Sequence, residues 1–444
     1  MERSHRLARR ILPACLVVAL LLTLAAADRS PARVVAVADV HGAYAELVAI
    51  LQRTRLIDGN RKWIGGSATL VQTGDVLDRG ARSRECLDLL MALERQAAKQ
   101  GGTVIPLLGN HEVMNVMGDL RYVTPEIYRT FATAGSEKKR QQAYKACLEF
   151  LSAHAGHAHT VIPPTDDATR GKWMEEHPPG FVEYREAFGP EGKYGRWIRT
   201  HHAVVQIGDG VFVHGGLSPT LEFGSVRELD GRVIAELAAF DSIWRALVDS
   251  KVIWRYMKLA EAVRFAGEEL KWVQAGGKAE GSEADQPMQR LLGYKGWMAA
   301  SSSGPLWYRG LAEEPEDKLI GGVKAMLERL QAQYIVVGHT VESKADITPR
   351  FESRVFLLDT GMLNEEYGGR ATALDIQNGR FTAHYANGEP KALPAPGSVQ
   401  STSKREARLA ARPSWAASPG EHDGRTQILI PASPPPLVGI SRKD

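Results

Sequence analysis

Short apolar runs of strand composition divide this chain, and several of them end in glycine and a polar side chain. Between the first runs lie segments whose apolar residues recur at helical spacing. This alternation predicts parallel strands joined by crossover helices. The expected strands are residues 34–38, 70–73, 104–108, 203–207, 211–213, 334–338, 354–358, 371–376 and 380–385. The expected helices are residues 43–56, 84–98, 136–153 and 222–275.

Five of the expected strands end in a polar cluster that also contains glycine. The clusters are Asp39-Val40-His41-Gly42, Gly74-Asp75-Val76-Leu77-Asp78-Arg79-Gly80, Gly109-Asn110-His111-Glu112, His214-Gly215-Gly216 and Gly338-His339-Thr340. Ligands of open α/β sheets bind at the carboxyl ends of the strands. Carboxylate, imidazole and amide oxygens together form a ligand set for divalent metals, and glycine allows the backbone a sharp turn. The pattern therefore predicts a metal site at one end of the sheet.

Each of these side chains has a simpler explanation when it is taken singly. Asp39 could cap the helix expected from Ala43, and Asn110 could be an ordinary turn residue. His214 or His339 alone would more often be a hydrogen-bonded core histidine. The occurrence of all of them at five strand ends favours the metal site.

Together the five clusters resemble the motifs of the calcineurin-like metallophosphoesterase superfamily, specifically its phosphoprotein phosphatase family. The matching pieces, in the family's order, are DVHG (39–42), GDVLDRG (74–80), GNHE (109–112), HGGLSP (214–219) and GHT (338–340). GPLWYRG (304–310) and LDTGM (358–362) are similar to the bacterial Shewanella-like branch. The resemblance departs from the common pattern where Ala38 precedes Asp39. It implies an α/β fold, a β-sandwich flanked by helices with a mostly helical cap insertion.

The resemblance also implies a site for two divalent metal ions with one shared carboxylate. Mn, Fe or Zn suits this mixture of hard and borderline ligands better than Ca. One group of implied ligands is Asp39, His41 and Asp75. The other is Asp75, Asn110, His214 and His339, so that Asp75 would bridge the two ions.

Catalytic roles follow from the same resemblance. His111 would be the general acid that protonates the leaving oxygen, and Asp78 would orient it and favour its charged form. Arg79 would bind the phosphate, whose oxygens match its planar fork, with Asn110 and Arg309 as further phosphate-binding residues. A surface turn is the simpler explanation of Asp78 and Arg79, and a structural loop that of the Arg309 segment.

The implied reaction is hydrolysis of phosphate monoesters by direct attack of metal-bound hydroxide, because two metal ions neutralise the phosphate and activate water. The substrate would be a phosphorylated protein, on Ser/Thr or Tyr, or a small phosphoester. One alternative is a dinucleoside polyphosphate or nucleotide hydrolase of the same superfamily. The other is an exported non-catalytic binding protein on a degenerate phosphatase scaffold, which the intact set of ligand candidates disfavours.

The two ends of the chain differ in composition from its middle. Residues 1–27 combine a basic start, an apolar run and a small-residue end, which predicts a signal peptide and export to the periplasm or beyond. An uncleaved N-terminal anchor is the alternative; after cleavage we expect no stable membrane insertion. The metallophosphoesterase domain is expected at 33–387, with insertions near 113–200 and 220–300. Residues 388–444, rich in Pro, Ser and Ala, are expected to be a disordered tail.

The charge balance, the cysteines and a group of histidines add little to this prediction of fold and function. Of 55 basic and 52 acidic residues, four arginines and one glutamate lie in the first 27, which leaves 51 of each. This balance argues against a nucleic-acid-binding face. Cys86 and Cys147 could pair in an exported protein, although two free thiols explain them as well. His154, His157 and His159 could bind a metal, but a solvated histidine-rich turn is the favoured explanation.

Overall fold

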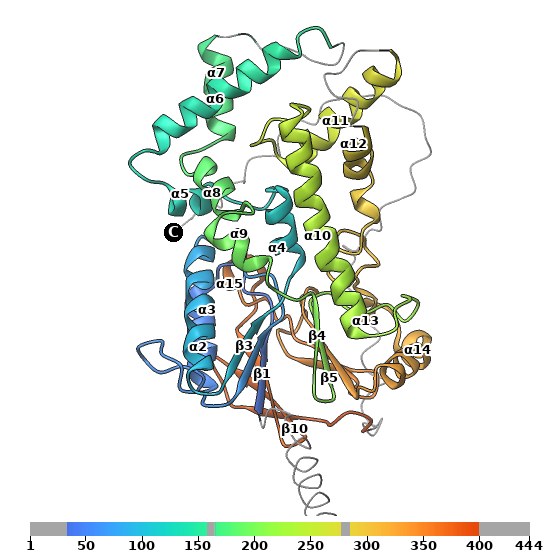
Figure 1. Cartoon of the computed structure of the whole chain (residues 1–444). Helices are drawn as coiled ribbons and strands as arrows, with labels where there is room; N and C mark the ends of the chain where they lie inside the picture. Colours follow the sequence, from blue (N-terminus) through green and yellow to red (C-terminus); the bar gives the residue numbers. More distant parts are fainter. Residues whose placement is uncertain (1–32, 158–163, 165, 277–284, 399–444) are drawn as a thin grey trace, which may run out of the picture. The chain divides into compact units, whose positions relative to one another are not determined.

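The computed structural model describes residues 33–157, 164, 166–276 and 285–398, and it contains two β-sheets (Figure 1). The prediction for residues 1–27 and most of that for 388–444 fall outside these residues. The strands are β1 Arg33–Val37, β2 Thr69–Gln72, β3 Thr103–Pro106, β4 Val204–Ile207, β5 Gly210–Val213, β6 Tyr334–Val337, β7 Thr348–Arg350, β8 Val355–Leu357, β9 Thr372–Gln377, β10 Arg380–Tyr385 and β11 Lys391–Leu393.

The described helices range in length from four residues in α13 and α15 to 24 residues in α10. They are α2 Tyr44–Arg53, α3 Ser83–Ala98, α4 Asn110–Met117, α5 Pro125–Phe131, α6 Ser136–Ala153, α7 Asp167–Glu176, α8 Phe181–Phe188, α9 Lys193–Ile198, α10 Val226–Asp249, α11 Leu259–Gln274, α12 Asp285–Leu292, α13 Gly310–Glu313, α14 Glu316–Arg329 and α15 Asn364–Tyr367. None of the helices in the described part of the chain has the length and apolar character that crossing a membrane requires.

Each sheet contains three parallel strands, at one end of the first sheet and in the centre of the second. The first has the order β11-β10-β9-β1-β2-β3, with β1, β2 and β3 parallel and the remaining pairs antiparallel. The second has the order β4-β5-β6-β8-β7, with β5, β6 and β8 parallel. Parallel neighbours need a crossover between them, and α2 and α3 supply it for the first three strands. The predicted alternation of strand and helix is therefore confirmed there.

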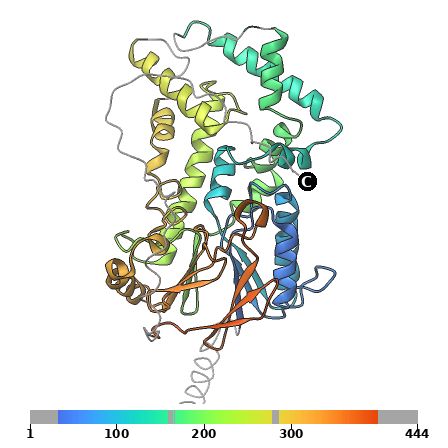
Figure 2. The same cartoon turned by 180° about the vertical axis from the view of Figure 1, so that it is seen from behind.

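Alternation of side chains along the strands builds the layers. Val35 and Val37 of β1 pack in the core that contains α2 and α3. Ala36, between them in sequence, points the other way and packs in the core shared with Phe356 of the second sheet. The outer face of that sheet, including Val337, packs against α14. The result is the predicted β-sandwich flanked by helices, seen from both sides in Figures 1 and 2.

A mostly helical cap follows the third strand, as expected. α4 begins directly beyond β3, and α5 to α9 continue from it on the side of the sheets where these strands end (Figures 1 and 2). α10, α11 and α12 form a second helical insertion between β5 and β6. Both insertions therefore lie where the strand-end clusters emerge.

Two segment boundaries differ from the prediction. Residues 222–275 are not one helical stretch, because the chain between α10 and α11 leaves the helix at Lys251, whose φ is 58°. Ordered structure also continues past residue 387, where the tail was expected to begin. β11 pairs there with β10, and Leu393 is buried. Three residues at a sheet edge are too few to show a periodic pattern.

The two cysteines are free thiols, so the disulfide alternative is not realised. Cys86 is buried in α3 and Cys147 is half-buried in α6. Burial raises the pKa of Cys147 to about 11, which makes it a poor nucleophile at neutral pH. Both therefore act as small apolar residues of the core.

The prediction of a solvated histidine-rich turn is wrong for two of its three residues. His154 is buried, and its ring lies edge-on to Phe265 of α11 at 5.4 Å. The Nδ1 atom of His157 lies 2.7 Å from the carboxylate of Glu269, also on α11. His159 lies outside the described residues. Packing of α11 over the turn explains the difference, because that helix comes from a distant part of the sequence.

Candidate active site

The strand-end clusters meet at the carboxyl ends of β1, β2, β3, β5 and β6. Backbone hydrogen bonds tie the loops together; the N–H of His41, for example, donates to the carbonyl of Asp75 at 3.0 Å. The approach of the second and third loops requires glycine. Gly74 has a φ of 101°, and a Cβ atom there would lie 2.5 Å from the nitrogen of Gly109. The predicted convergence of the five clusters is therefore confirmed.

Several of the predicted site residues have left-handed backbone conformations. They are His41 (φ 45°), Asp75 (59°), Asp78 (70°), Arg79 (66°) and His339 (67°). Such conformations are uncommon for residues with a Cβ atom, and each costs on the order of 1 kcal/mol or more. They persist only where surrounding structure holds them, and they concentrate at functional sites.

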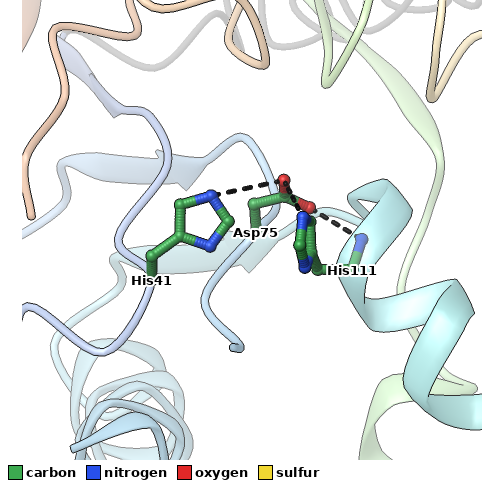
Figure 3. A group of neighbouring side chains, drawn as sticks. All are labelled: His41, Asp75 and His111. Carbon is green, nitrogen blue, oxygen red and sulfur yellow. Dashed lines mark hydrogen bonds and ion pairs between the residues drawn. The ribbon is translucent and has the colours of Figure 1, made fainter. Parts of the chain in front are cut away.

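One group of neighbouring side chains that could hold a metal ion is His41, Asp75 and His111, drawn in Figure 3. The Nε2 atom of His41 lies 3.7 Å from Asp75 Oδ2 and 3.9 Å from Asp39 Oδ2. Its Nδ1 atom donates to the carbonyl of Leu77 at 2.8 Å, so the Nε2 lone pair faces the carboxylates. Burial lowers the pKa of His41 to about 3, which keeps the ring in its neutral, ligating form.

The second group also contains Asp75. The Nε2 atom of His214 lies 2.8 Å from Asn110 Oδ1, 3.1 Å from His339 Nδ1 and 3.3 Å from Asp75 Oδ2. Its Nδ1 atom donates to the carbonyl of Thr73, which fixes the ring. The Nε2 atom of His339 is buried and has no hydrogen-bond partner among the described residues. Burial lowers the pKa of His339 to about 2.

These residues fit divalent cations. Burial and the neighbouring carboxylates of Asp359 and Asp75 raise the pKa of Asp39 well above its usual range. Burial opposes ionisation of Asp75 too, but the charges of His214 and His111 hold its pKa well below that range. A cation would stabilise these buried carboxylates beside the neutral imidazoles of His41 and His339. Oxygen and imidazole donors in two groups with a shared carboxylate match a pair of divalent ions.

The predicted general acid, His111, belongs to the first of these groups. The Nδ1 atom of His111 donates to Asp78 Oδ2 at 2.6 Å, which leaves its Nε2 atom free to face Asp75. Asn115 Nδ2 donates to the other oxygen of Asp78 at 2.9 Å, and the hydroxyl of Tyr184 donates to Asn115 Oδ1 at 2.6 Å. Burial alone would lower the pKa of His111, but the charges of Asp75 and Asp78 outweigh it and raise that pKa.

The two predicted phosphate arginines each contact a histidine of the strand-end clusters. The guanidinium of Arg79 lies 5.2 and 5.3 Å from the ring centroids of Tyr122 and Tyr367, and it hydrogen-bonds the hydroxyl of Tyr367. The guanidinium also donates to Nε2 of His41 at 2.6 Å. A positive group therefore lies at this potential metal-ligating nitrogen. Arg309 donates to the carbonyl of His339 at 2.8 Å. The segment that carries Arg309 is thus both a structural loop and part of the site.

Three residues of the site received no role in the sequence analysis. The carboxylate of Glu112 accepts N–H groups from Asp75 at 2.7 Å and from Gly109 at 2.9 Å, and thereby braces two ligand loops. Asp359 follows β8 as the other carboxylates follow their strands, so the same pattern could have identified it. Asn115 has no such signal, because its role depends on the meeting of helices from distant parts of the chain.

Comparison with protein families agrees with this site. The family model described as Calcineurin-like phosphoesterase matches residues 32–343, which is well over half of the chain. The chain belongs to the calcineurin-like phosphoesterase family. The expectation of a phosphoesterase enzyme is therefore confirmed at the level of the family.

Curated relatives confirm the resemblance to the Shewanella-like branch. Shewanella-like protein phosphatase 2 of Arabidopsis thaliana is 34% identical over 199 residues, which is 44% of this chain. That alignment spans only 50% of the plant protein. Shewanella-like protein phosphatase 1 of Plasmodium berghei is 23% identical over 343 residues, with 76% of this chain and 69% of the relative covered.

Solved structures confirm the fold. A cold-active protein tyrosine phosphatase superposes with a TM-score of 0.52, covering 83% of this chain and 80% of its own at 22% identity. The enzyme of this name from a psychrophilic Shewanella species has a TM-score of 0.50 at the same identity, covering 82% of this chain and 80% of its own. At this identity the likeness extends to the fold alone.

Proposed function

We propose that this chain hydrolyses phosphate monoesters on proteins. The observation that carries the proposal is the pair of donor groups that share Asp75, with the His111–Asp78 pair beside them. We propose two divalent ions there, Mn, Fe or Zn, on the predicted ligands. When bound, such ions neutralise the phosphate and activate water for attack. The predicted ligands are Asp39, His41 and Asp75 for one ion, and Asp75, Asn110, His214 and His339 for the other.

In this proposal the remaining side chains bind phosphate and move one proton. Arg79, Arg309 and the amide of Asn110 bind the phosphate oxygens. His111 holds a proton on Nε2 and gives it to the leaving oxygen, while Asp78 keeps the ring oriented and charged. Asp78 can do this because Asn115 fixes its other oxygen.

For the substrate we propose phosphotyrosine in preference to phosphoserine or phosphothreonine. Tyr122 supports this choice, because its side chain is 41% exposed and its ring centroid lies 5.0 Å from that of His111. An aromatic leaving group protonated by His111 would lie beside that ring, and aromatic pairs at such distances attract each other. A serine or threonine side chain would gain nothing comparable.

A turnover assay with metal analysis tests the proposal. The purified protein with added Mn should hydrolyse p-nitrophenyl phosphate, and Asp75→Asn should lose both its bound metal and its activity. Near-normal turnover or metal content in that variant would rule out the shared carboxylate. Among a phosphotyrosine peptide, a phosphoserine peptide and diadenosine tetraphosphate, the first should have the highest kcat/KM. Tyr122→Leu should reduce that preference, and preference for the nucleotide would favour the nucleotide hydrolase instead.

A further inference from the structure

A cavity of about 670 Å³ lies among α4, α8, α10 and the loops that follow α8 and α10. Val116 and Met117, at the C-terminal end of α4, line it, whereas Asn110 and His111 begin the same helix. Figure 1 shows α4 beside α10, with α8 and α9 on its other side. None of the proposed metal ligands or phosphate-binding residues lines this cavity. Its volume is that of a small-molecule site, and it is separate from the catalytic one.

Arg185 lies in an otherwise largely apolar part of the cavity wall. Its Nε atom is buried without a hydrogen-bond partner, and Nη2 donates to the carbonyl of Met257 at a long 3.3 Å. No acidic side chain in the described part of the chain forms an ion pair with it. The charge of Glu261 favours the charged form of Arg185 without an ion pair between them. The carboxylate of Glu261 instead accepts the N–H of Lys258 at the start of α11. The apolar neighbours are Met117, Phe188, Phe240, Trp244 and Val248.

A second arginine in the same wall, Arg199, has several hydrogen-bond acceptors for its guanidinium, in contrast to Arg185. Arg199 binds both carboxylate oxygens of Asp241, at 2.7 and 2.8 Å, and donates to the carbonyls of Phe188 and Gly195. The acid next to Arg185 in sequence, Glu186, is held at 2.8 Å by Lys139 and at 3.1 Å by the hydroxyl of Tyr256. The acids near Arg185 therefore already have partners, and among the described residues Arg185 has no acidic partner.

Charges at the mouth of the cavity do not supply the missing partner. Glu191 and Asp249 are exposed there, and so are Arg245 and Arg255, so that the rim is balanced. A guanidinium is always charged and carries five N–H donors, and its burial is unfavourable without an anion to accept them. Burial accordingly lowers the pKa of Arg185.

We propose that this cavity binds a small organic anion. Its oxyanion head group would accept hydrogen bonds from Arg185, whose planar fork matches two oxygens. Its flat apolar body would pack on Phe240 and Trp244, the latter with its ring centroid 5.7 Å from the guanidinium. A carboxylate, sulfonate or phosphate ester shares this head-group chemistry. Inorganic phosphate lacks the body and would leave the apolar wall uncovered.

A pair of dyes tests this proposal in the full-length protein. 8-Anilino-1-naphthalenesulfonate carries an oxyanion on an aromatic body, and N-phenyl-1-naphthylamine has the same rings without the charge. The wild type should bind the sulfonate saturably and more tightly than the neutral dye. Arg185→Gln should weaken sulfonate binding by about tenfold or more, since a hydrogen bond to a charged group is lost. Its affinity for the neutral dye should change by less than about twofold.

Three controls test whether the sulfonate binds at Arg185. Arg185→Lys should retain part of the preference for the sulfonate, because it keeps the charge but not the fork. Arg245→Gln removes an exposed arginine from the same rim and should bind both dyes as the wild type does. Excess inorganic phosphate, which competes at the catalytic centre, should leave sulfonate binding unchanged. Melting temperature and turnover of p-nitrophenyl phosphate report whether each variant is folded.

Several results would overturn the proposal. Wild-type protein that binds the two dyes equally tightly has no anion site in this cavity, and this result needs no variant. Sulfonate binding that survives in Arg185→Gln, or that falls equally in Arg245→Gln, would remove Arg185 as the anchor. Displacement of the sulfonate by inorganic phosphate would place the dye at the metal centre.

Discussion

A series of hydrogen bonds leads from the cap to His111, the proposed general acid, and its members can be removed one at a time. Tyr184 donates to Asn115, Asn115 to Asp78, and His111 to Asp78, at 2.6, 2.9 and 2.6 Å respectively. His111→Ala removes the acid itself. Asp78→Asn removes its charge partner, and Tyr184→Phe removes only a distant donor. We expect the loss of rate to decrease in that order.

The structure sets the expected magnitudes. A general acid contributes about 10²–10⁴-fold to a rate. In Asp78→Asn, asparagine tolerates the left-handed backbone found there. Its amide, however, must point one N–H group toward His111 or Asn115, both of which are donors. Loss of a charged hydrogen bond, about 1.5–3 kcal/mol, corresponds to about 10- to 150-fold. Tyr184→Phe loses a neutral bond of about 0.5–1.5 kcal/mol, or about 2- to 12-fold.

The assay is single-turnover hydrolysis of two aryl phosphates with different leaving groups. Phenolate is more basic than p-nitrophenolate and needs its proton more, so each variant should lose more rate on phenyl phosphate than on p-nitrophenyl phosphate. Arg79→Ala is the matched control, because Arg79 is proposed to bind the phosphate common to both substrates and its loss should slow both alike. Equal losses on the two substrates in His111→Ala would refute the reasoning, and some other group would have to protonate the leaving oxygen.

Three further predictions concern stability. Chelation of metal by EDTA should lower the melting temperature, because the ions bind only the folded clusters; an unchanged melting temperature after verified metal loss would contradict this. Burial, with His202 nearby, lowers the pKa of His201 to about 3, below its unfolded value near 6.5, so stability should fall as pH drops below 6.5. At pH 5 His201 should account for about 2 kcal/mol of this loss. Measured by urea unfolding, the loss should therefore be smaller by about that amount in His201→Leu and should be unchanged in His202→Gln; an unchanged loss in His201→Leu would contradict the prediction. A chain ending at residue 387 should melt lower than one ending at 398, because it lacks β11; equal melting would show that β11 adds no stability.

The strand-end clusters could be predicted because their signals are local. An apolar run followed by glycine and a metal-binding side chain fits within ten residues, as at Asp75 and Asn110. The parallel sheet then brings the clusters together without further information. Asp359 has the same signal after β8, and attention to strand ends alone would have found it.

Features that depend on distant packing could not be predicted in this way. Asn115 and Tyr184 are 69 residues apart in sequence, and only the meeting of α4 and α8 gives them a joint role. The histidine turn after α6 has the polar composition of a solvated loop, yet Glu269 and its helix cover it. Arg185 resembles any helical arginine until the cavity around it is known. In each case the deciding neighbour comes from another helix.

The hydroxyl of Tyr184 has a consequence for exchanging parts between phosphoesterases. Tyr184 belongs to a cap helix, whereas Asp78 lies on the loop after β2 and Asn115 on the helix after β3. A chimera that joins this sandwich to another enzyme's cap would leave the buried amide oxygen of Asn115 without a donor, unless the new cap supplied one. Any redesign of the cap for new substrates would therefore also alter how firmly His111 is oriented.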